Sequence, residues 1–312
     1  MLRILDARTG EPVAAAPARR GLTRIEAYAS GLDPTALRVL LTADLLVRAL
    51  ELGGTPVWAI LTAPHRPAEL RTAATTLAIR PFEDGRDVAS GLGEAQVIHV
   101  VARDAQDRPG EGPLLAVAPV IWAGPADAVA GRPLAADGEV EPTGGEVPAV
   151  DADVRAPGGG ARPADGGVGE TDGASPGGGP AAAVAVPDDM THGDLSALLA
   201  DPAALRLSLL SVPRGAPVRL DAAGLAEAAR TLAGWRRAVA GWSRQPSRPV
   251  PEEVRVRLRA AWEDDLDLPG VLAVLRDVAD APGLPDGARF ETYVYADRLL
   301  ALDLARDLGS LP

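Results

Sequence analysis

Short apolar runs and helical patterns alternate over the first part of the chain. The stretch 24–46 is typical of a strand, a short loop and a helix, and apolar positions recur at helical spacing until Gly53 and Gly54. Since strands joined by such helices pair in parallel with right-handed crossovers, we expect a doubly wound α/β domain over residues 1–131. Three further apolar runs, rich in Val, Ile and Trp and too short for helices, predict buried strands: residues 55–63, 96–102 and 114–122.

The pattern dissolves over residues 132–187. Between residues 155 and 180 the chain is mostly Gly, Pro, Ala and Asp, and it holds no apolar side chain larger than Val. Such a segment cannot bury enough surface to offset its ordering entropy, so a flexible Gly/Pro-rich linker is expected. A phosphate-cradling loop is the alternative, but no strand precedes these glycines and no Gly-Lys-Ser/Thr follows them.

Helical periodicity returns over residues 188–312, where we expect an antiparallel bundle. Asp201 is placed to cap a helix and Pro202 to occupy its first position, where proline loses no hydrogen bond. Further helices are predicted from apolar residues at three-and-four spacing: residues 221–243, 251–264, 269–280 and 286–308.

Composition excludes several kinds of chemistry. The chain has no Cys and no Lys, so all 31 basic residues are Arg. Disulfides, thiolate zinc sites, a P-loop lysine and Schiff-base catalysis are therefore impossible. The net charge of −12 disfavours binding to nucleic acid in general. With no apolar stretch of signal-peptide or membrane-spanning length, the expected location is the cytoplasm and no membrane partner is expected.

Three segments carry a resemblance to a known family. The segment "DPAALRLSLLS" (201–211), the segment "AAWEDDLDLPGVLAVLRDV" (260–278) and the segment "LVRALELGGTPVWAILTAPHRPAEL" (46–70) resemble the cysteinyl-tRNA synthetases and their relative, the cysteine ligase of mycothiol biosynthesis. The resemblance implies a class I, reduced Rossmann-type domain followed by the synthetase bundle. It also implies ATP-dependent activation of an amino acid.

The motifs that perform this chemistry in the family are missing. The family's zinc-binding Cys falls within "YASG" (28–31), its H-I-G-H motif falls on "DPTA" (33–36), and its K-M-S-K-S motif falls near "VPDDMTHGDL" (186–195) without either lysine. The family's zinc set cannot be rebuilt without Cys. Losing the histidines and lysines should cost several kcal/mol of transition-state stabilisation. We therefore expect no zinc and no competent ATP site.

The replacement of the first ATP motif has a physical interpretation. A helix N-terminus is a natural anion site, and the resemblance implies that relatives use this one for phosphate. Here Asp33 is placed to cap that helix and Pro34 to begin it. The fixed carboxylate should then repel ATP. Residues near this end of the domain that could still bind a ligand are Tyr28, Ser30, Asp33, Arg38 and His65.

Other polar groups have a functional and a structural interpretation. His65 follows a strand and could line a site, or be an ordinary loop residue; His192 with Asp188 and Asp189 could bind a metal, or form a turn. The acids Asp264, Asp265 and Asp267 are more readily explained by helix capping than by a metal site. The candidates for nucleic-acid contact on the bundle are Arg236, Arg237 and Arg244.

Three hypotheses remain open. The first is a catalytically degenerate synthetase-like protein that acts as a binding or regulatory module for an unknown protein or small-molecule partner. The second is an ATP-dependent amino-acid ligase that uses arginines such as Arg38, Arg66 and Arg71. The third is an accessory protein that contacts tRNA through the bundle arginines, although the net charge disfavours it.

Overall fold

The computed structural model describes residues 1–17, 21–84, 94–105, 109–123 and 192–309. The predicted linker at 132–187 lies outside these residues, and the predicted domain boundaries stay predictions. None of the described helices is both long and apolar enough to cross a membrane.

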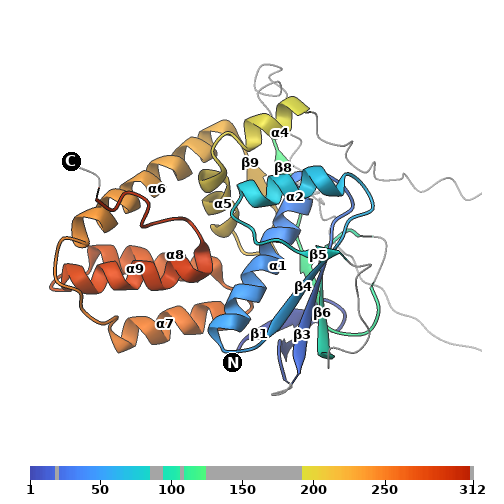
Figure 1. The fold of residues 1–312 in the computed structure, drawn as a ribbon, viewed down its shortest axis with the longest axis horizontal. Coiled ribbons are helices and arrows are strands. Elements are labelled where there is room, and N and C mark those ends of the chain that lie inside the picture. The colour runs from blue at the N-terminus through green and yellow to red at the C-terminus, as the bar shows by residue number, and fades with distance from the viewer. Residues whose placement is uncertain (18–20, 85–93, 106–108, 124–191, 310–312) are drawn as a thin grey trace, which may run out of the picture. The chain divides into compact units, whose positions relative to one another are not determined.

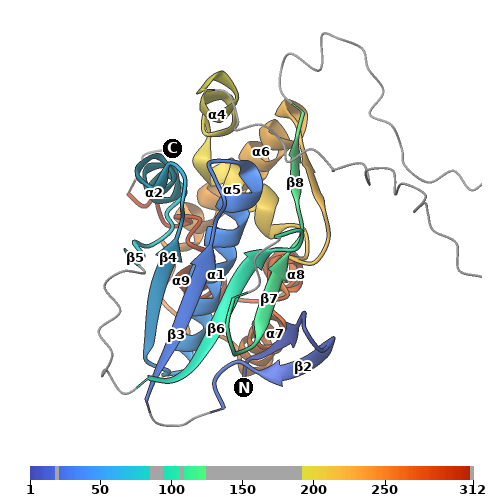
Figure 2. The ribbon, with the colours of Figure 1, turned by 90° about the vertical axis from the view of Figure 1, so that its right-hand side faces the viewer.

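A five-stranded parallel sheet lies in the first part of the chain, as predicted (Figure 2). The strand order is β5-β4-β3-β6-β7, so the chain winds outward from β3 in one direction and then in the other. This is a doubly wound order. The chain runs from β3 toward β4 and from β6 toward β7, so the loops after β3 and β6 diverge at the carboxyl edge of the sheet. The strands are β3 (Leu22–Tyr28), β4 (Val57–Thr62), β5 (Glu83–Asp84), β6 (Glu94–Ala102) and β7 (Leu114–Val117).

Helix α1 (Pro34–Leu52) begins and ends where the apolar pattern predicts, and it packs on one face of the sheet (Figures 1 and 2). Alternate residues of β3 are fully buried, Ile25 and Ala27 among them, while Arg24, Glu26 and Tyr28 between them stay partly exposed. The two faces of β3 therefore differ in chemistry, since one is apolar and the other carries the polar side chains.

The run 114–122 does not form one strand. It splits at Ala118 and Pro119 into β7 and β8 (Val120–Trp122), and β8 pairs in parallel with β9 (Val218–Leu220) in a separate sheet. Proline has no N–H to continue a ladder, which explains the break. The sequence also did not predict β9, helix α2 (Pro67–Thr76) or the hairpin of β1 (Arg3–Asp6) and β2 (Glu11–Ala14).

The second part is helical, as predicted, and its helices pack on one another. The last predicted helix ends eight residues early, because Ala301 adopts a left-handed conformation with φ of 48° and the Asp297 carboxylate accepts hydrogen bonds from the Leu302 and Leu304 N–H groups. The helices are α4 (His192–Leu198), α5 (Pro202–Leu210), α6 (Ala222–Trp242), α7 (Glu252–Glu263), α8 (Leu268–Asp280) and α9 (Asp286–Leu300).

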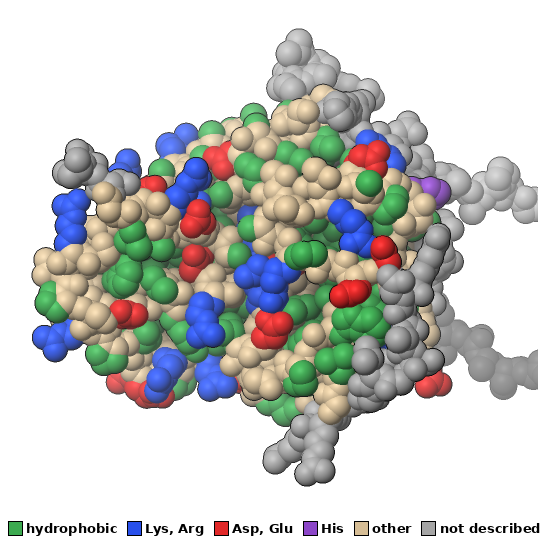
Figure 3. Space-filling view, in the orientation of Figure 1, with side chains coloured by type: hydrophobic (Ala, Val, Ile, Leu, Met, Phe, Trp, Pro, Cys, Tyr) green, Lys and Arg blue, Asp and Glu red, His purple; other side chains and the backbone are tan. Residues whose placement is uncertain are grey.

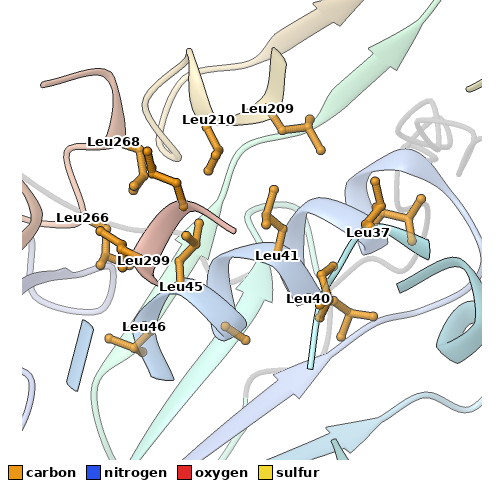
Figure 4. Packing of buried hydrophobic residues seen from close by; sticks show 14 of the residues in the cluster. Leu37, Leu40, Leu41, Leu45, Leu46, Leu209, Leu210, Leu266, Leu268 and Leu299 are labelled. Carbon is orange, nitrogen blue, oxygen red and sulfur yellow. The ribbon is translucent and has the colours of Figure 1, made fainter. Parts of the chain in front are cut away.

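One apolar core joins the helices to the sheet domain. Leu41 and Leu45 of α1 lie against Leu209 and Leu210 of α5 and against Leu268 at the start of α8 (Figure 4). All five side chains are buried. The described residues before and after the gap at 124–191 thus form one compact unit.

Candidate functional site

The N-terminus of α1 is closed by its own cap. Asp33 has an extended backbone, and its Oδ1 accepts hydrogen bonds from the backbone N–H groups of Thr35 (2.7 Å) and Ala36 (2.9 Å). Pro34 occupies the first position of the helix. The predicted cap is therefore confirmed, and a carboxylate takes up two of the N–H groups that a bound phosphate would need.

Ser30 and His65 lie at the same edge of the sheet as Asp33. Tyr28 and Thr62 are paired at the ends of the parallel strands β3 and β4, so the loops that follow these strands begin side by side. Ser30 and His65 are exposed in these loops. The structure thus brings three of the five candidates to the carboxyl edge, where open sheets bind ligands.

Tyr28 belongs to a polar cluster on the sheet face opposite α1. Its hydroxyl donates to Glu26 Oε2 at 2.5 Å, and its ring centroid lies 5.8 Å from that of His99 on β6. Glu26 Oε2 is 3.0 Å from His99 Nδ1, and Glu26 Oε1 is 3.2 Å from Arg24 Nε. The cluster therefore centres on one carboxylate with several donors.

His99 faces an acceptor on each side. Its Nε2 lies 2.9 Å from the Glu111 carbonyl oxygen, and its Nδ1 faces Glu26 Oε2 on the other side of the ring. The hydrogen bond with His99 lowers the pKa of Glu26 against the opposing effect of burial, with smaller contributions from Tyr28 and Arg24. Burial and then the Glu26 carboxylate raise the pKa of Tyr28. Tyr28 is thus held as a neutral donor.

No pattern in the sequence assigned a role to His99. The sequence did hold a signal for the polar cluster: Glu26 and Tyr28 alternate with buried apolar residues, which indicates that the two side chains share one face of the strand. The turn that presents the Glu111 carbonyl depends on Gly112, whose φ is 120° and where a Cβ would lie 2.7 Å from the Val97 carbonyl oxygen.

Arg38 is buried and bonded entirely to main chain. Its two terminal nitrogens donate to the carbonyls of Ala118 (3.0 Å), Val212 (3.2 Å), Pro213 (2.8 Å) and Ala216 (2.7 Å). Burial, followed by the charges of nearby arginines, lowers its pKa to about 10. All four N–H bonds of the terminal nitrogens have protein acceptors, so in this conformation Arg38 joins α1 to the 212–216 loop rather than facing the carboxyl edge.

A second buried arginine lies in an ion cluster around Asp44 of α1. The Asp44 carboxylate is 2.8 Å from Arg48, 3.1 Å from Arg80 and 3.3 Å from Arg206. Arg206 also donates to the carbonyls of Leu77 and Leu300, and burial lowers its pKa to about 10. Asp44 therefore links α1 to α5 and to the segment after α2.

Two other arginines of the ligase hypothesis have protein partners. Arg71 donates to the Phe82 carbonyl and to Asp84. Arg66 precedes α2 as its N-cap with a left-handed backbone, and its Nε lies 3.6 Å from Glu69. Of these two, only Arg66 follows a strand at the carboxyl edge, next to His65.

The bundle arginines differ from one another. Arg236 is half-buried and donates to the carbonyls of Leu302 and Asp303, so it fixes the segment after α9. Arg237 and Arg244 are exposed, and within the described ranges neither has an ion-pair partner. On the face drawn in Figure 3, basic and acidic side chains are interspersed.

The acidic residues near 264 have structural roles. Asp267 caps α8 by accepting from the Gly270 N–H, and Asp265 accepts from the Leu5 N–H and pairs with Arg214. The described part of the chain contains no group of three or more His, Cys, Asp or Glu that could hold a metal ion. The side chains of Asp188, Asp189 and His192 lie outside the described residues.

Two curated proteins match part of the chain, whereas no family model matches it. It is 39% identical over 109 residues to the L-cysteine:1D-myo-inositol 2-amino-2-deoxy-alpha-D-glucopyranoside ligase of Streptosporangium roseum, a match that covers 34% of this chain and 26% of that enzyme. It is 47% identical over 76 residues to the ligase of the same name from a Parafrankia species, covering 24% of this chain and 16% of that enzyme. The matched stretches thus span about a quarter or less of each relative. Part of this chain is thus similar in sequence to part of two cysteine ligases.

Proposed function

We propose that the protein is a catalytically degenerate relative of these cysteine ligases that acts as a binding or regulatory module. Its partner is a protein or a small molecule, and it needs neither zinc nor ATP. The partial similarity to the two ligases supports the origin, and the cap at Asp33 supports the loss of adenylation. The cytoplasmic location expected from the sequence is part of this proposal.

The observation that carries the proposal is the carboxylate at the N-terminus of α1. A helix N-terminus attracts a phosphate through its free N–H groups and its positive dipole. Asp33 bonds two of these N–H groups and cancels the favourable potential with its own charge. No lysine is available to replace the lost cationic contacts. Nucleotide binding at this edge would therefore place like charges together.

The test is ATP–pyrophosphate exchange with each proteinogenic amino acid, with the Streptosporangium roseum ligase and cysteine as the positive control. We expect no exchange above background with any amino acid. If exchange occurs, is lost in His65→Ala and is retained in the control Gln245→Ala, the protein is instead a ligase with altered active-site residues. Gln245 serves as the control because it is exposed and lies beyond α6. Arg38→Ala is unsuitable for this purpose, because it removes four hydrogen bonds that hold the fold.

A second candidate function is contact with tRNA. It is favoured by Arg237 on α6 and by Arg244 just beyond the end of α6, which are both exposed and have no ion-pair partner among the described residues. Retention of tRNA on a filter at low salt should fall in the variant carrying both Arg237→Ala and Arg244→Ala. Arg230→Ala is the matched control, because Arg230 is also exposed on α6 but pairs with Glu227. Equal retention by both variants would remove this candidate.

A further inference from the structure

A pocket of about 180 Å³ lies beside the first half of β4. It is bounded by the second half of α1, by Val57–Ala59 and by residues 80–83. Val57 begins β4, so the pocket lies at the amino ends of the strands, away from Asp33 and His65 at the carboxyl ends. The residues that line it are Asp44, Val47, Glu51, Val57, Trp58, Ala59, Arg80, Pro81, Phe82 and Glu83.

The size and the lining of the pocket suit one apolar ring. Val47, Val57, Ala59 and Phe82 supply apolar surface, and Trp58 adds a second aromatic residue. An apolar cavity of about 150 Å³ is known to accept benzene. The pocket is partly open to solvent, and its volume of about 180 Å³ has room for one ring and a small substituent.

The edge of β4 supplies hydrogen-bonding groups to this pocket. The N–H groups of Thr23 and Ala29 on β3 donate to the carbonyls of Pro56 and Thr62, so even-numbered residues of β4 direct their carbonyls toward β3. The main-chain groups of Val57 and Ala59 then point to the other side. Strand β5 pairs with Ile60 and Leu61, and the pairing of Ile60 with Glu83 occupies the Ala59 carbonyl. The Val57 main-chain groups and the Ala59 N–H have no strand beside them among the described residues. A ligand amide could pair with this edge.

Three charged side chains around the pocket, Asp44, Glu51 and Arg80, are already paired. Arg80 Nη1 lies 2.6 Å from Glu51 Oε2, and Arg80 Nε lies 3.1 Å from Asp44 Oδ1. Asp44 is further compensated by Arg48 and Arg206. An anionic ligand would meet Glu51 and Glu83, and a cationic ligand would compete with Arg80. An uncharged ligand needs no rearrangement of these ion pairs.

We propose that this pocket binds a small, uncharged, planar ring compound that carries an amide. The ring occupies the apolar space between α1 and Phe82, and the amide bonds to the Val57 carbonyl and the Ala59 N–H at the edge of β4. The site is distinct from the carboxyl edge, so it does not depend on the proposed loss of adenylation, and the exchange assay has no bearing on it.

The first experiment is a titration of the full chain with benzamide, followed by amide chemical shifts in NMR, with benzoate and benzylamine as charged controls of similar shape. We expect saturable shifts at Val57–Ala59 and at Arg80, Phe82 and Glu83, with binding about tenfold weaker for both charged compounds. Absence of saturable shifts at these residues, or shifts confined to the carboxyl edge, would overturn the proposal.

A substitution that fills the pocket provides the second test. Ala59→Leu should weaken benzamide binding by about tenfold or more, whereas Ala226→Leu, the same change at an exposed position of α6, should leave it unchanged. Unaltered affinity in Ala59→Leu would contradict the proposal. If Ala59→Leu fails to fold, the shift map of the unsubstituted chain still decides the outcome.

Discussion

At the scale of single residues, the fold depends on buried charges that link distant parts of the chain. Asp44 and Arg206 are each about 1% exposed, and removing one partner of a buried pair leaves an uncompensated charge. Asp44→Asn should therefore lower the free energy of unfolding by about 3–5 kcal/mol, measured by urea denaturation. The control Glu227→Gln breaks an exposed pair and should cost less than about 1 kcal/mol. If Asp44→Asn and Glu227→Gln lower the free energy of unfolding by similar amounts, the structural role of Asp44 is contradicted.

Glu26 gives the stability a dependence on pH. Its pKa is lower in the folded protein, chiefly through the hydrogen bond with His99, so it adds stability above its unfolded pKa of about 4.3. That contribution is lost as the pH falls through the folded value. Glu26→Gln should cost about 2 kcal/mol at pH 7, and this difference should shrink as urea denaturation is repeated toward pH 3. Glu252→Gln, at an exposed ion pair, should show no such pH dependence; a constant difference for Glu26→Gln would contradict the assignment.

The residues that sequence reasoning placed correctly are those whose partners are local. Asp33 and Asp201 cap helices through N–H groups two or three residues ahead, and such bonds follow from the order of residues alone. Arg38 was expected to face a ligand, but its acceptors include carbonyls more than 170 residues away. His99 meets Glu26 only because β3 and β6 are neighbours. Strand order decides such contacts, and no local pattern encodes it.

At the scale of elements, too, features set by nearby residues could be predicted and features set by distant residues could not. Local signals marked both ends of α1, Asp33 and Pro34 at its start and Gly53 at its end. The end of α9 instead depends on hydrogen bonds to Asp297 and on left-handed residues that no apolar period predicts. The split between β7 and β8 was foreshadowed by Pro119, but their placement in different sheets required β9 from far along the chain.

The cap at Asp33 can be tested as part of α1. Asp33→Ala removes the acceptor for the Thr35 and Ala36 N–H groups and should lower the free energy of unfolding by about 1 kcal/mol. Asp201→Ala, at the cap of α5, is the matched change and should cost a similar amount. Both are measured by thermal and urea unfolding. A negligible loss in Asp33→Ala alone would mean that the cap is not formed in solution.

Replacement of glycine by alanine should have opposite effects on stability at two helical positions. A Cβ at Gly287 in α9 would lie 2.0 Å from the Pro246 carbonyl oxygen, so Gly287→Ala should cost about 1–3 kcal/mol through overpacking. Gly234 in α6 has open space at that position, so Gly234→Ala should stabilise by about 0.5–1 kcal/mol. Calorimetric midpoints that move in the same direction for both variants would contradict the packing of α9 against residue 246.

At the scale of the whole molecule, the shared core predicts cooperative unfolding. Leu41 of α1 is 2% exposed and belongs to the apolar core on the side of the sheet. Leu209 and Leu268 belong to the same core on the side of the helical part. A core that spans both parts cannot lose one half without exposing the apolar surface of the other. The described residues on either side of the gap are therefore expected to behave as one folding unit.

Leu41→Ala tests this cooperativity. It should lower the free energy of unfolding by about 2–5 kcal/mol, and native-state hydrogen exchange should show the same loss of protection for amides in β3 and in α8. The loss in α8 is informative because α8 lies more than 200 residues along the chain from the substitution. Val256→Ala, at a side chain that is 54% exposed, should change neither region. Protection that falls in β3 while α8 keeps its original values would mean that sheet and bundle unfold independently, and the continuous core would then contribute little to the stability of the helices.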